Sequence, residues 1–170
     1  MLNDLPGNLN APILIVQHMP AGFTKSLASR LNGLSSLSVK EAEDGDILKN
    51  GTAYIAPGGF HLTAARSGRD LVIHLDESPP RNGHRPSVDV MFESVGEIKE
   101  IRKIAVIMTG MGADGRNGLV AMKKSGEVKA IAESKESSIV FGMPRAVIES
   151  GLADEVQNIE RIAESILKYV

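Results

Sequence analysis

The chain has 170 residues, enough for one domain with a hydrophobic core of its own. Apolar residues make up 42% and aromatic residues only 4%, so aliphatic side chains must build the core, which favours an α/β fold. A net charge of −2 gives no general reason to expect nucleic acid as a partner, and the absence of cysteine excludes disulfides and thiolate chemistry. The sequence shows neither a signal peptide nor a membrane-spanning run, so we expect a cytoplasmic protein without membrane insertion.

Short apolar runs alternate with helical patterns in the first half of the chain. The run Pro12–Val16 predicts a strand buried on both faces, and it leads directly into Gln17-His18-Met19-Pro20. The next helix is expected to begin with Thr24 as its N-cap. The expected elements of this half are strands at 12–16, 37–40 and 52–56, a helix at 23–31, and hairpin arms at 61–66 and 71–75.

The alternation continues after a polar loop at 79–86. This loop contains Arg81, His84 and Arg85 and is expected to be solvated and locally positive. Ser87 is predicted to cap the helix that follows. The expected elements of this half are helices at 88–100, 115–124, 145–150 and 159–170 and strands at 104–108 and 129–133. Together the elements predict one α/β domain, with a doubly wound, mostly parallel sheet, helices on both faces and an inserted antiparallel hairpin.

A glycine turn with one carboxylate follows the apolar strand at 104–108. Open α/β sheets place their ligands at such carboxyl ends of strands. Gly110, Gly112 and Gly115 have the spacing of a dinucleotide-binding fingerprint, with Glu133 placed as the ribose-binding acid. Against this interpretation, the turn brings a negative charge to the helix N-terminus where a pyrophosphate must bind.

The same carboxylate, Asp114, supports a second interpretation in which it pairs with His18. Both residues follow the carboxyl ends of predicted strands, so we expect them within hydrogen-bond reach at one edge of the sheet. An acid in that position orients an imidazole and stabilises its protonated form, and N–H groups of the glycine turn are available to an oxyanion. The pattern predicts part of an acyl-transfer site.

Six motifs along the chain occur in the order in which one known family carries them. They are Gln17-His18-Met19-Pro20 with Gly22-Phe23-Thr24, Val39 to Gly45, Tyr54 to Gly58, His84 to Asp89, Thr109 to Gly115, and Val140 to Pro144. Over nearly its whole length the sequence closely resembles the catalytic domain of CheB, the chemotaxis protein-glutamate methylesterase. The resemblance implies a cytoplasmic hydrolase that removes methyl esters from glutamates on chemoreceptor helices and deamidates certain glutamines there. It implies no cofactor and no metal ion.

The resemblance assigns roles to three residues of this sequence. His18 matches the general base of the family's Gln-His-Met-Pro motif, and Asp114 matches the acid that orients it. Met111 matches the methionine whose backbone N–H serves the oxyanion.

The resemblance also implies a serine nucleophile in a Ser-Thr-Gly-Gly turn, which does not occur in this sequence. In the family this turn follows the first strand and precedes the histidine by one helix and one strand. We therefore expect residues 1–170 to be an amino-terminally incomplete domain, without its first strand or the family's receiver domain, and with negligible esterase activity of its own. The alternatives are a non-catalytic relative that binds receptor helices or another chemotaxis protein and, less favoured, the dinucleotide-binding protein.

Overall fold

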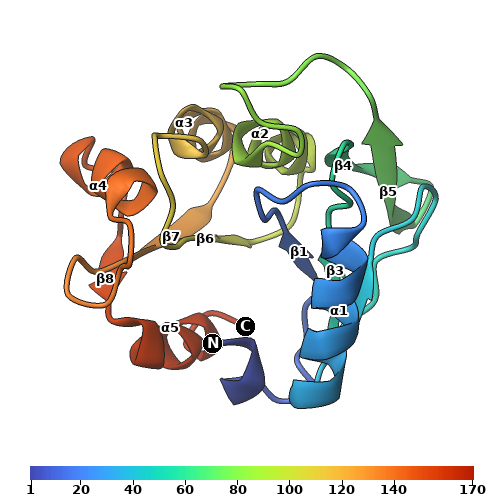
Figure 1. Cartoon of the computed structure of the whole chain (residues 1–170), viewed down its shortest axis with the longest axis horizontal. Helices are drawn as coiled ribbons and strands as arrows, with labels where there is room; N and C mark the ends of the chain where they lie inside the picture. The colour runs from blue at the N-terminus through green and yellow to red at the C-terminus, as the bar shows by residue number, and fades with distance from the viewer.

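The computed structural model describes residues 1–170 and places parallel strands between layers of helices (Figure 1). The strands are β1 (Ile13–Ile15), β2 (Ser38–Glu41), β3 (Thr52–Ile55), β4 (His61–Ser67), β5 (Asp70–Asp76), β6 (Lys103–Ile107), β7 (Val128–Glu133) and β8 (Glu155–Gln157). The helices are α1 (Phe23–Leu34), α2 (Val88–Glu97), α3 (Arg116–Ser125), α4 (Gly142–Glu149) and α5 (Ile159–Leu167), with a 3-10 turn η1 (Leu2–Asp4). None of these helices combines the length and the apolar character needed to span a bilayer.

The parallel strands form two three-stranded sheets with the orders β1-β3-β2 and β6-β7-β8. Strands β4 and β5 form the predicted antiparallel hairpin. The predicted α/β fold with an inserted hairpin is therefore confirmed, with its parallel strands divided between two sheets. One edge of β1 and one edge of β6 have no strand partner.

Two hydrophobic clusters, one on each face of the strands, form the core. Alternation along β3 shows the division, because Tyr54 belongs to one cluster and Ala53 and Ile55 to the other. The first cluster lies under α2, α3 and α4, and the second lies against η1, α1 and α5, where the two chain ends meet (Figure 1). Helices thus cover both faces of the strands, as the apolar periodicity predicts.

Three local expectations are wrong in detail. Strand β1 is half-buried rather than fully buried, because it has a partner strand on one side only. Neither Thr24 nor Ser87 caps its own helix with its side chain. Instead the Thr24 hydroxyl donates to Glu41 at 2.6 Å, and the Ser87 hydroxyl donates to Asp114 at 2.7 Å. Both hydroxyls satisfy carboxylates that lie far away in the sequence.

Candidate active site

The structure brings His18 and Asp114 together at the carboxyl ends of β1 and β6. His18 lies in the segment that follows β1, and Asp114 lies in the glycine turn between β6 and α3. His18 Nε2 and Asp114 Oδ2 are 2.7 Å apart. The Asp114 side chain is only 1% exposed and that of His18 is 21% exposed, so the imidazole lies between a buried acid and the surface.

Hydrogen bonds from α2 converge on the Asp114 carboxylate. Oδ2 accepts the Val88 N–H at 2.7 Å in addition to His18. Oδ1 accepts the Ser87 hydroxyl at 2.7 Å and the Asp89 N–H at 3.1 Å. Burial alone would raise the pKa of Asp114, but the donors from His18 and the start of α2 outweigh it and hold this pKa well below its usual range. Asp114 is therefore ionised at neutral pH.

The ionised acid decides which nitrogen of His18 carries the proton. A carboxylate only accepts hydrogen bonds, so Nε2 must donate and the neutral ring leaves Nδ1 unprotonated. In the triad of serine proteases the acid binds Nδ1 and the base is Nε2. The assignment is reversed here, and Nδ1 is the nitrogen available to take a proton from a reacting group.

A second buried carboxylate, Asp89, holds the turn that carries Asp114. Its Oδ1 accepts the N–H groups of Gly115 at 2.9 Å and Gly118 at 2.6 Å, which lie at the start of α3. Asp114 in turn accepts N–H groups at the start of α2. Asp89, a residue of α2, therefore caps α3, and Asp114, which precedes α3, caps α2. The Asn82 amide donates to Asp89 Oδ2 at 2.8 Å and to Asp114 Oδ1 at 3.3 Å, which joins the two carboxylates. From the sequence, Asp89 is named only as the end of the motif that begins at His84 and is assigned no role in the site.

This cross-capping depends on the close approach of α2 and α3. A Cβ at Gly118 would lie 2.7 Å from the backbone of Asp89, so only glycine fits at this contact. The same capping also argues against the dinucleotide interpretation. The N–H groups at the start of α3, which would have to bind a pyrophosphate, already donate to a carboxylate.

Hydrogen bonds to neighbouring segments fix Thr109 and Gly110 at the start of the glycine turn and leave the Met111 N–H unpaired. The Gly110 N–H donates to Val140 O at 2.9 Å, and the Val140 N–H donates to Thr109 Oγ1 at 2.8 Å. The Thr109 N–H donates to Glu133 Oε2 at 2.7 Å, so the acid of the dinucleotide interpretation is a buried support of the turn. Met111 is 77% exposed and its N–H has no acceptor in the chain, which leaves it free for an incoming oxygen.

The loop at 79–86 is not the purely solvated loop that its composition predicts, because His84 contacts the site. Its ring stacks on the ring of His18, with centroids 3.7 Å apart and planes inclined by 8°. No local sequence signal indicates this contact, since the two histidines come from distant motifs. His61 is fully buried and its Nε2 lies 3.1 Å from Pro79 O at the start of the loop, whereas His74 lies on the exposed hairpin.

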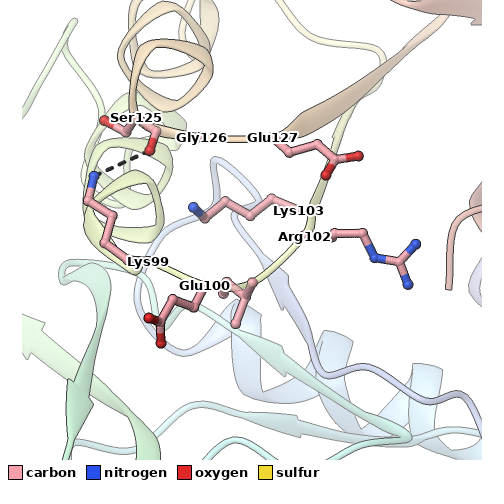
Figure 2. A pocket seen from close by; sticks show the side chains of 8 residues that line it. Lys99, Glu100, Arg102, Lys103, Ser125, Gly126 and Glu127 are labelled. Carbon is pink, nitrogen blue, oxygen red and sulfur yellow. Dashed lines mark hydrogen bonds between the residues drawn. The ribbon is translucent and has the colours of Figure 1, made fainter.

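A pocket at the opposite ends of β6 and β7 offers no comparable chemistry (Figure 2). Lys103 Nζ lies 3.5 Å from Gly96 O in the last turn of α2, and Lys99 Nζ donates to Ser125 O at the end of α3 at 3.3 Å. Burial, followed by the charge of Lys99, lowers the pKa of Lys103. Cations are favourable beside helix carboxyl termini, so both lysines have a structural explanation.

Comparisons with known proteins agree with the geometry. A family model described as CheB methylesterase matches residues 1–166. The protein-glutamate methylesterase/protein-glutamine glutaminase of Geobacillus kaustophilus is 57% identical over 170 residues, and that of Halalkalibacterium halodurans is 59% identical over 168 residues. These alignments cover 100% and 99% of this chain but 49% and 48% of the relatives, so the chain spans about half their length. The crystal structure of the Thermotoga maritima CheB methylesterase catalytic domain superposes with a TM-score of 0.96 at 48% identity, covering 100% of this chain and 89% of that one.

Proposed function

The chain belongs to the CheB methylesterase family, and we propose that it provides the base, the orienting acid and the oxyanion donor for hydrolysis of glutamate methyl esters. The proposed substrates are the cytoplasmic helices of methyl-accepting chemoreceptors, on which the same site would also deamidate glutamines. The observation that carries this proposal is the 2.7 Å contact between His18 Nε2 and Asp114 Oδ2, with Nδ1 left free.

In the proposed reaction, His18 Nδ1 takes the proton of a hydroxyl nucleophile as its oxygen attacks the ester carbonyl. The carbonyl oxygen becomes an oxyanion, which the N–H of Met111 stabilises. Asp114 stabilises the imidazolium through Nε2, and the imidazolium then gives its proton to the leaving methoxy oxygen as the ester C–O bond breaks, so that methanol departs. Water attacks the acyl intermediate with the same proton transfers, which releases the glutamate and restores the hydroxyl.

The nucleophile is the part of this reaction that residues 1–170 do not supply. The His18 ring is hydrogen-bonded to Asp114 and to no serine or threonine hydroxyl of the chain. We propose that a Ser-Thr-Gly-Gly turn, as the family carries it, brings the hydroxyl to Nδ1. Loss of a triad nucleophile removes nearly all triad-dependent rate, so residues 1–170 alone should be almost inactive.

Methanol release from a methylated receptor fragment tests the proposal. Residues 1–170 should release almost none, whereas the same residues preceded by a relative's segment that contains Ser-Thr-Gly-Gly should release it at an enzymatic rate. In the joined protein, His18→Gln should lower kcat by about 10⁴- to 10⁶-fold. The matched control is His74→Gln on the exposed hairpin, which should leave kcat unchanged.

Two outcomes would contradict this assignment. Release of methanol by residues 1–170 alone would show that the hydroxyl lies within them. A joined protein that binds receptor fragment but releases no methanol would support the non-catalytic alternative.

A further inference from the structure

The loop that carries His84 is built around a tight turn at Asn82 and Gly83. Both residues have positive φ, 54° and 78°, which is typical of a type I′ turn with the sequence Asn-Gly. The Arg81 N–H donates to His84 O and the His84 N–H donates to Arg81 O, each at 2.9 Å. This backbone is therefore ordered by its own turn chemistry and presents His84 in a defined direction.

Contacts on both sides of the turn fix the loop to the body of the domain. Arg81 Nη2 lies 2.6 Å from Glu93 Oε1 on α2, and the Asn82 amide reaches the two buried carboxylates of the site. On the other side, the Gly59 N–H donates to Arg85 O at 3.1 Å, which ties the loop to the turn after β3. The position of His84 thus follows from several independent contacts.

The stacked ring lies where it limits the movement of His18. The hydrogen bond to Asp114 holds Nε2 but leaves the ring free to tilt about that point. A flat ring at 3.7 Å and 8° covers one face of the imidazole and blocks tilting toward that face. The direction of Nδ1 is the quantity that this contact controls.

We propose that His84 is a positioning residue, whose flat ring fixes the plane of His18 and thereby aims Nδ1 at the reacting hydroxyl. This proposal rests on the proposed function, because aiming Nδ1 matters only if Nδ1 is the base. The stacking itself does not depend on that function and is tested without any hydrolysis.

Charge supports the same role. Burial, followed by the positive charge of protonated His18, lowers the pKa of His84, and the negative charge of Asp114 acts against them. His84 therefore stays neutral while His18 carries the transferred proton. A neutral aromatic face next to a cation is favourable, whereas a second imidazolium would repel the first.

Two substitutions of similar volume separate stacking from simple space filling. His84→Phe keeps a flat ring over His18, and His84→Leu fills the same space without one. Both variants of the 170-residue protein, labelled with ¹⁵N in histidine, are compared with the wild type by long-range ¹H–¹⁵N correlation spectra. These spectra report the tautomer and mobility of His18, and amide spectra report the fold.

We expect wild type and His84→Phe to show one sharp set of His18 signals with the proton on Nε2. In His84→Leu the set should broaden or shift as the ring moves. Identical His18 signals in the Phe and Leu variants would overturn the proposal, and so would loss of the native amide spectrum in both, which would give His84 a role in folding instead. Failure of the methanol assay with intact stacking would overturn the esterase mechanism and leave the stacking result standing.

Discussion

Asp114→Asn is the most informative perturbation of this site. The amide keeps one acceptor oxygen and turns the other position into a donor. If its NH₂ group replaces Oδ2, it opposes the Val88 N–H, and His18 must change tautomer to accept from it. Nδ1 would then carry the proton and could no longer act as a base. If NH₂ replaces Oδ1, it opposes the Asp89 N–H and the Asn82 amide instead, whereas the Ser87 hydroxyl can turn to accept from it.

The magnitude follows from this count of donors. One buried N–H left without an acceptor costs about 1–3 kcal/mol, and each charge-assisted hydrogen bond that becomes neutral loses about 1 kcal/mol. Asp114 accepts five hydrogen bonds, so with one N–H unpaired and at least two bonds weakened the free energy of unfolding should fall by at least about 3 kcal/mol at pH 7. The depressed pKa of Asp114 means that this contribution is present above the pKa of the unfolded chain, 3.8, and is lost as pH falls below it.

Urea denaturation from pH 7 down to pH 2 measures both features. The wild type should exceed Asp114→Asn by a constant amount above about pH 5, and the difference should shrink steadily below about pH 4. Asp70→Asn, at an exposed carboxylate of the hairpin, is the control and should change stability by less than about 0.5 kcal/mol. A variant as stable as the wild type at pH 7, or a difference that does not depend on pH, would refute the account of Asp114.

Two further predictions concern the contacts around the pair. Gly118→Ala should destabilise the protein by at least about 2 kcal/mol, because the added Cβ would meet the α2 backbone at 2.7 Å. Gly33→Ala on α1, where the added Cβ meets open space, should stabilise the protein by about 0.5–1 kcal/mol. Thermal unfolding of the two variants measures both effects. NMR titration should place the pKa of His84 below 6.5, and His18→Gln should raise it, because that variant removes the neighbouring charge but keeps a donor to Asp114. A pKa of His84 that is the same in both proteins would contradict this account.

Periodicity and turn residues predict most of the fold because they report local interactions. The apolar run at 104–108 and the hairpin arms around Ser67-Gly68-Arg69-Asp70 appear within a residue or two of their expected places. The half-burial of β1 does not follow from its apolar run alone, because it depends on whether another strand lies beside it. Strand β8 has only three residues and carries no periodic signal.

Within the site, the sequence predicts the pair His18 and Asp114 but not the residues that support this pair. His18 and Asp114 could be paired because parallel strands deliver both to one edge. Ser87 had a plausible local role as a cap, so its bond to a distant carboxylate gave no separate signal. The contacts of Asp89 and His84 arise from tertiary packing between segments that no local pattern connects.

The cross-capping of α2 and α3 makes the site unfold as a unit. Asp89 accepts hydrogen bonds from the first turn of α3, and Asp114 accepts them from the first turn of α2. If either turn opens, the buried carboxylate that caps it loses its hydrogen bonds. The two turns therefore belong to one cooperative unfolding unit with the core beneath them. Hydrogen exchange at the amides of Val88 and Gly115 should proceed only through opening of that unit, so Asp114 keeps its place for as long as the domain stays folded.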